Sequence, residues 1–235
     1  RKCIQETIDG KAIFPVTGNH DVLHDTEASG MDGRLNYDNF QNDLLEKADC
    51  LGYVVEHAPN GAYSVQFGNL NVIGMQCVTS GRKFLFPQGK QIDWLEDHLA
   101  KTSAAWHIIL CHAPLIHHNA SRSTGTPYLN LDRRIQEIVD STGRVIWLSG
   151  HTHHSPNALE GNVEHDAGHN NIYLDCGSVV DTDTSREIGL MAPEWKDGCR
   201  TELTISDDEV EICMSSIESG IHFSRGYYHF SCKLH

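Results

Sequence analysis

The sequence predicts an α/β protein in which short buried strands alternate with amphipathic helices. Apolar runs such as 145–148 are rich in β-branched residues and lack polar alternation, which is typical of strands buried on both faces. Segments such as 131–141 repeat apolar residues at helical spacing. Several of the apolar runs end in residues that can bind metals, and sites in such folds lie beyond the carboxyl ends of strands.

Length and charge narrow the class further. The 235 residues are enough for one domain with a substantial core, so we expect a single domain over 1–235. With 32 acidic and 18 basic residues the net charge is −14, which argues against a broad nucleic-acid surface. Apolar runs are all short of membrane-spanning length, so no membrane association is expected.

The eight cysteines contain no CxxC pair, and their spacing follows no disulfide framework. We therefore expect mostly buried free thiols in a reducing compartment, and a cytoplasmic location.

Five elements are predicted in the first half of the chain. Gly18 ends the first apolar run, and Gly52 ends a helix whose apolar face holds Phe40, Leu44, Leu45, Ala48 and Leu51. An alternating segment, a Gly-Asn turn and a returning strand predict an antiparallel hairpin that feeds a second sheet. The predicted elements are a strand at 12–16, a helix at 37–51, a hairpin at 62–67 and 70–75, a helix at 91–101 and a strand at 106–111.

The second half begins with a helix at 131–141, whose inward face carries Ile135, Ile138 and Val139. Strands are predicted at 145–148 and 172–176, and the stretch from 154 to 171 is polar. Three further short strands are predicted at 202–205, 210–214 and 227–230.

Three of the apolar runs end in residues with metal-binding atoms. Asn19, His20 and Asp21 follow the first run, His112 follows the run at 106–111, and the run at 145–148 leads to Gly150-His151-Thr152-His153. The intervening segments can return the chain to the same sheet edge, where distant residues converge. Imidazoles with an amide oxygen form a ligand set that suits manganese, iron or zinc. This set does not indicate thiolate chemistry.

Each of these stretches taken alone has another interpretation. His151 and His153 point the same way only if the backbone stays extended, and a chain with 16 histidines can carry a surface pair. Asn19 or Asp21 can instead close an Asx turn. His117 and His118 can line a pocket, but the solvated-loop interpretation is favoured. Three strand ends in succession favour a metal site.

These blocks give the chain a resemblance to the calcineurin-like metallophosphoesterases over essentially its whole length. The resemblance rests on Gly18-Asn19-His20-Asp21, on His112 after a hydrophobic strand, and on Gly150-His151-Thr152-His153. It implies a four-layer α/β/β/α sandwich with two facing mixed sheets. It also implies two divalent ions, manganese, iron or zinc, and a small-molecule phosphoester substrate.

The resemblance assigns roles to individual residues. Asn19, His112 and His151 are expected to bind one metal ion and His153 the other. His20 is expected beside the scissile phosphate, and Asp21 is expected to orient His20. The implied reaction is hydrolysis of a phosphomonoester or phosphodiester by a hydroxide that bridges the two ions.

The sequence departs from the family pattern upstream of Gly18. Members of the family also have a DxH block and a GDxxD block, and neither occurs in the 17 residues before Gly18. We expect that an N-terminal portion, with its strand-helix units, lies outside this sequence. Alternatives are a catalytically inactive binding or regulatory domain and a site completed by another chain. For these 235 residues alone we expect weak or single-site metal binding and little turnover.

Overall fold

The computed structural model describes residues 11–18, 33–80, 83–86, 89–115, 118–119, 133–151, 162–176, 199–206, 209–216 and 230–233. These residues belong to two compact units, 1–112 and 113–235. The fold is α/β in both, and its strands form parallel as well as antiparallel pairs.

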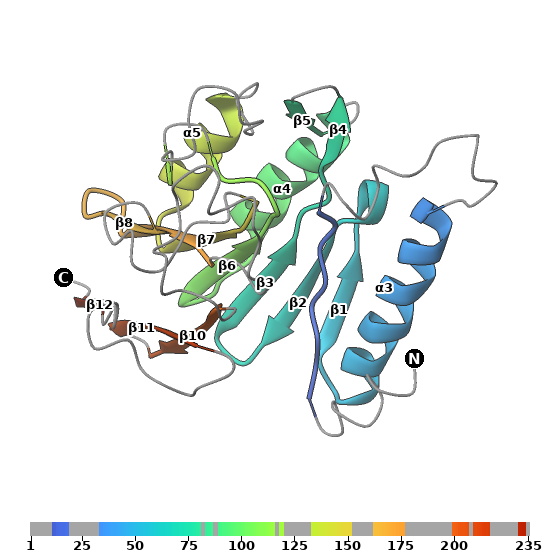
Figure 1. The fold of residues 1–235 in the computed structure, drawn as a ribbon, viewed down its shortest axis with the longest axis horizontal. Coiled ribbons are helices and arrows are strands. Elements are labelled where there is room, and N and C mark those ends of the chain that lie inside the picture. Colours follow the sequence, from blue (N-terminus) through green and yellow to red (C-terminus); the bar gives the residue numbers. More distant parts are fainter. Residues whose placement is uncertain are drawn as a thin grey trace. The chain divides into compact units, whose positions relative to one another are not determined.

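The first unit is built on four hydrogen-bonded strands in the order β1-β2-β3-β6 (Figure 1). Strands β1, β2 and β3 pair antiparallel, and β3 pairs with β6 in parallel. The hairpin therefore lies in the sheet of β6, and the prediction that it feeds a second sheet is wrong. The four strands are β1 (Val54–His57), β2 (Tyr63–Phe67), β3 (Leu70–Gly74) and β6 (Trp106–Leu110).

The first unit also holds two long helices, a short 3-10 helix and a small hairpin. The predicted helices are confirmed as α3 (Gly33–Cys50) and α4 (Lys90–Lys101). Leu44, Leu45 and Ala48 of α3 are buried, whereas Phe40 and Leu51 are exposed, so its apolar face is narrower than predicted. The remaining elements are η1 (Pro59–Gly61) and the antiparallel pair β4 (Val78–Ser80) and β5 (Lys83–Leu85).

The strand predicted at 12–16 is not formed. Residues 11–18 run over β2 without pairing to any strand of the described part of the chain (Figure 1). Phe14 packs against the buried cluster of Leu45, Tyr63 and Val65, and the hydroxyl of Tyr63 donates a hydrogen bond to the carbonyl of Pro15 at 3.0 Å. Proline has no backbone donor, and side chains instead of a strand ladder position this segment.

The second unit contains a parallel strand pair, an antiparallel neighbour and one helix. Helix α5 (Arg133–Thr142) buries Ile135, Ile138 and Val139 as predicted. β7 (Val145–Ser149) pairs in parallel with β9 (Asn171–Asp175). β8 (Val163–Asp166), which the polar sequence did not suggest, pairs with β9 in antiparallel orientation.

A separate sheet in the second unit consists of β10 (Cys199–Ile205), β11 (Glu209–Ser216) and β12 (Phe230–Lys233), all antiparallel. Alternate residues of β11, namely Val210, Ile212 and Met214, are buried, so one face of this sheet is covered. No helix in the described part of the chain is long and apolar enough to span a membrane.

Candidate metal centre

The carboxyl ends of β3 and β6 bring together two of the predicted blocks. The two strands are parallel, with Gly74 opposite Leu110, and the amide of Met75 donates to the carbonyl of Leu110 at 2.9 Å. His112 follows β6 at this edge and is partly buried. The backbone of Gly18 lies against the His112 ring, because a Cβ at residue 18 would be 3.0 Å from Cε1 and 3.1 Å from Nδ1.

The segment that leads to Gly18 is fixed by a chain of amide contacts. The backbone amide and the hydroxyl of Thr17 both donate to Oε1 of Gln76, at 2.8 and 2.7 Å. Gln91 of α4 in turn accepts from the amide of Gln76 and donates to its carbonyl, at 3.0 and 2.8 Å. All three side chains are buried, so these bonds hold Thr17, and with it Gly18, at the strand ends.

Asn19, His20 and Asp21 lie outside the described residues, as do His117 and His153. Their predicted roles therefore stay predictions. What the structure adds is the position of Gly18, the residue before them, at the face of the His112 imidazole.

His151 lies two residues beyond β7, at the carboxyl end of a buried parallel strand. Its exposed fraction is 9%, and its φ is +67°, in the left-handed region that non-glycine residues seldom adopt. The backbone therefore turns at His151 and does not continue as a strand. The prediction that His151 and His153 point the same way requires an extended backbone, and this requirement is not met at His151.

The same edge of the second unit holds a carboxylate that the sequence analysis did not single out as a ligand. Asp175, the last residue of β9, lies opposite Ser149 and is fully buried. The amide of Cys176 donates to the carbonyl of Ser149 at 2.8 Å, which fixes the two strand ends together. Because carboxylates are common ligands of divalent ions, this position at the carboxyl end of β9 makes Asp175 a further candidate for the site.

His118 is not a solvated loop residue. Its ring stacks on Tyr173 of β9 with a centroid distance of 3.5 Å, and its Nδ1 lies 2.9 Å from Oε2 of Glu164. Oε1 of Glu164 also accepts a hydrogen bond from the amide of Asn119. The favoured solvated interpretation of His118 is therefore wrong, because this histidine anchors its loop to β8 and β9.

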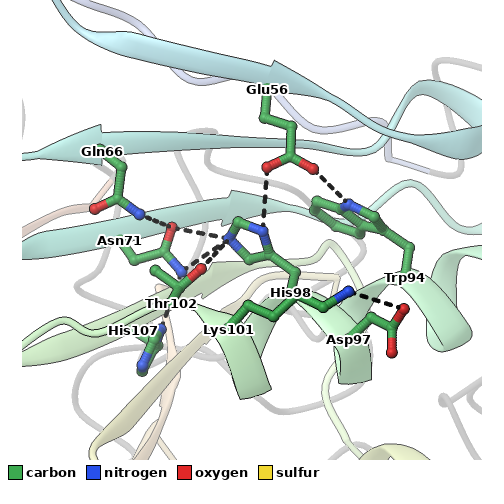
Figure 2. Close-up of polar contacts among 9 residues, drawn as sticks. All are labelled: Glu56, Gln66, Asn71, Trp94, Asp97, His98, Lys101, Thr102 and His107. Atoms are coloured by element: carbon green, nitrogen blue, oxygen red, sulfur yellow. Dashed lines mark hydrogen bonds and ion pairs between the residues drawn. The ribbon is translucent and has the colours of Figure 1, made fainter.

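A second polar cluster of the first unit lies at the amino ends of β3 and β6, away from His112 (Figure 2). Nδ2 of Asn71 is 3.1 Å from Nε2 of His98 and 3.0 Å from Nδ1 of His107. Glu56 lies 3.3 Å from Nδ1 of His98 and accepts a hydrogen bond from Trp94. One amide group can donate to both rings, so the arrangement suits neutral imidazoles and has a structural role.

The protonation of these histidines is expected to weaken the fold in acid. Burial, with the nearby His98, lowers the pKa of His107 from 6.5 to about 4. The unfolded chain therefore takes up this proton at a higher pH than the folded chain does. The contribution of neutral His107 to the free energy of unfolding is therefore fully present above pH 6.5. It is lost as the pH falls toward 4, and the loss amounts to about 3 kcal/mol. Urea unfolding at several pH values measures this loss.

His107→Gln is the matched variant, because its amide can still accept from Asn71 and does not titrate. The difference in unfolding free energy between the wild type and this variant should shrink or reverse between pH 7 and pH 4.5. A parallel decline in both proteins would show that His107 does not cause the acid sensitivity.

Comparison with known proteins gives one family and several distant structures. A family model described as calcineurin-like phosphoesterase matches residues 2–155. None of the curated proteins compared matches the sequence. Similar solved structures include the purple acid phosphatase PPD1 from yellow lupin (Lupinus luteus) seeds, with a TM-score of 0.48 and 15% identity over 74% of this chain and 32% of that chain.

Two further structures are similar at comparable levels. One is GAP50, the anchor in the inner membrane complex of Plasmodium, with a TM-score of 0.43 and 15% identity over 78% of this chain and 54% of that one. The other is PhoD, with a TM-score of 0.44 and 12% identity over 74% and 42%. The chain thus spans from about a third to about half of the length of these proteins.

Proposed function

Because the chain belongs to the calcineurin-like phosphoesterase family, whose model matches residues 2–155, we propose that it hydrolyses phosphomonoesters or phosphodiesters with two divalent metal ions. The matched range contains all the blocks on which the proposal rests, from Gly18 to His153. The proposed metal ligands are Asn19, His112, His151 and His153.

The observation that carries the proposal is the packing of Gly18 against the His112 ring. These residues are 94 positions apart in the sequence, and Thr17, Gln76 and Gln91 hold them at one strand edge. A Cβ at position 18 would press on the imidazole, so glycine here permits the backbone to approach His112. This approach supports the proposal, because ligands of one metal ion must come together from distant parts of the chain.

The donor set fits divalent ions. His112 and His151 are imidazoles at the carboxyl ends of β6 and β7, both partly or largely shielded from water. Imidazole nitrogens with amide oxygens suit manganese, iron and zinc. When bound, such ions supply Lewis-acid activation of water and neutralise charge on the phosphate.

The chain's own residues are proposed to supply the proton chemistry and the orientation. His20 is proposed to stabilise negative charge on the phosphate, or to hold the proton that the leaving oxygen receives. Asp21 is proposed to orient the His20 ring through its carboxylate, as neighbouring carboxylates do for other histidines. The buried amide chain from Gln91 to Thr17 fixes the segment that precedes both residues.

Replacing His20 by alanine is expected to lower turnover by about 10²- to 10⁴-fold, the usual contribution of a positioned acid-base group. Bound metal should stay near the wild-type level, because His20 is not a proposed ligand. Hydrolysis of p-nitrophenyl phosphate and bis(p-nitrophenyl) phosphate measures the first effect, and elemental analysis measures the second. Loss of metal together with activity would contradict this role for His20.

The experiment also distinguishes an enzyme from a non-catalytic domain of the same family. The DxH and GDxxD blocks do not occur in this sequence before Gly18. Metal-dependent turnover that depends on His20 supports the enzyme. Metal binding without turnover of either substrate, in protein extended by any upstream DxH and GDxxD blocks of its gene, supports a binding or regulatory domain.

A further inference from the structure

The second unit carries a group of ligand atoms far from the proposed phosphoesterase site. Asp140, Asp166 and His169 each offer one nitrogen or oxygen atom, and these atoms all lie within 4.8 Å of one another. They come from the last turn of α5, the end of β8 and the turn between β8 and β9. We propose that these three side chains form a surface zinc site that ties α5 to this turn.

This group lies at the opposite strand edge from His151. β7 and β9 are parallel, so His151 and Asp175 lie beyond their carboxyl ends, while Arg144 and His169 lie before their amino ends. The five residues of β7 separate the two edges by about 13 Å. The proposed zinc site therefore shares no residue with the phosphoesterase site.

The three ligands are each held by a contact outside the group or by their own turn. Oδ1 of Asp140 accepts a hydrogen bond from Nε2 of Gln136 at 2.8 Å. Oδ1 of Asp166 accepts from the amide of Gly168 at 2.9 Å, and its Oδ2 lies 2.6 Å from Nδ1 of His169. Ligands oriented in this way need little rearrangement to bind a metal ion.

The backbone of the β8–β9 turn is fixed against the start of β7. The carbonyl of His169 accepts from the amide of Arg144 at 3.1 Å. Gly143 and Arg144 both have positive φ, and a Cβ at Gly143 would be 3.0 Å from this carbonyl oxygen. This close approach fixes the backbone of His169 relative to α5, the helix that carries Asp140.

The chemistry of the group suits zinc. The group offers two carboxylate oxygens and one imidazole nitrogen, and it contains no thiolate. The two carboxylates carry negative charge that a divalent cation neutralises. Ligands of one Zn²⁺ lie about 2.0 to 2.2 Å from it and so about 3 to 4 Å apart. The hydrogen-bonded pair of Asp166 and His169, now 2.6 Å apart, must therefore widen, and any separation near the 4.8 Å limit must shorten; the half-exposed His169 side chain can make this adjustment. A water molecule completes the tetrahedron.

Binding replaces the proton shared by Asp166 and His169. Oδ2 of Asp166 and Nδ1 of His169 would hold the zinc ion once their side chains move apart, and the proton between them would leave to solvent. The carboxylate of Asp140 joins from the side of α5. The ion thereby links the helix to the turn and stabilises the second unit.

The test separates this site from the phosphoesterase centre. In a chain carrying His112→Ala, His151→Ala and His153→Ala, titration with Zn²⁺ should still give about one bound equivalent. Adding His169→Gln should weaken that binding at least tenfold. His165→Gln is the matched control, because His165 is an exposed histidine one residue before Asp166 and should leave binding unchanged.

A second readout does not depend on affinity. Paramagnetic Co²⁺ in the same background should broaden or shift the amide signals of Gly168 and His169, and Zn²⁺ should raise the melting temperature. Equal binding by the His169→Gln and His165→Gln proteins, or no binding at 1 mM Zn²⁺, would overturn the proposal and leave a plain surface ion pair. Neither result bears on the phosphoesterase proposal, since its proposed histidine ligands are removed.

Discussion

Replacing His112 by alanine is expected to remove most of the metal bound at the phosphoesterase site and to lower turnover at least a thousandfold. The imidazole is a proposed ligand, and Gly18, which lies against its ring, has no side chain that could take its place. Loss of a metal ion removes both the activated water and the neutralisation of phosphate charge. Elemental analysis and hydrolysis of p-nitrophenyl phosphate measure the two effects.

His57→Ala serves as the control, because His57 is an exposed histidine at the end of β1. It should leave metal content and turnover unchanged. Because His112 is only partly buried, its replacement should preserve the fold, which circular dichroism can check. A His112→Ala protein with wild-type metal content would remove the basis of the proposed site.

Replacing Gly74 by alanine is expected to destabilise the protein by about 3 kcal/mol or more, the upper range for overpacking a core. Gly74 lies directly opposite Tyr63 in the β2–β3 pair. A Cβ there would lie 2.2 Å from Cε1 and 2.3 Å from Cζ of the Tyr63 ring, which is fully buried. The ring can move aside only by displacing the side chains packed around it. Denaturant unfolding measures the change.

The control for this clash is a double variant that combines Gly74→Ala with Tyr63→Leu. Tyr63→Leu alone should be destabilising, since it removes a buried ring and its hydrogen bond to Pro15. In the Gly74→Ala background the same substitution should cost much less, because it makes room for the new methyl group. Additive effects of the two substitutions would show that the Gly74–Tyr63 contact is not the cause.

Regular periodicity allowed the helices and the β2–β3 hairpin to be predicted. The apolar positions of α4 and α5 repeat at helical spacing, and the Gly68-Asn69 turn marks the hairpin. The segment at 12–16 has the composition of a strand, but its place is set by Tyr63 and Gln76, residues about 50 to 60 positions away. β8 was missed because its sequence, Val-Glu-His-Asp, is polar and pairs only through β9.

The positions of two candidate site residues at strand ends could be predicted from the apolar runs before them. His112 and His151 follow apolar runs, and the structure places each beyond the carboxyl end of a buried strand. The left-handed turn at His151 could not be foreseen, because only tertiary packing imposes it on a residue with a side chain. Gln76 and Gln91 carry no sequence signal, since an isolated glutamine is common in surface loops and helices.

The attachment of residues 11–18 by side chains has a consequence for how this protein can change. Gln76 and Tyr63 anchor the segment at separate points through their side chains, and of the two only Tyr63 belongs to a strand ladder, that of β1, β2 and β3. A substitution at Gln76 would therefore loosen the segment that ends at Gly18 without removing a ladder hydrogen bond, whereas one at Tyr63 would also disturb the core. The position of Gly18 beside His112 can thus change through Gln76 while the strands of the sheet keep their register.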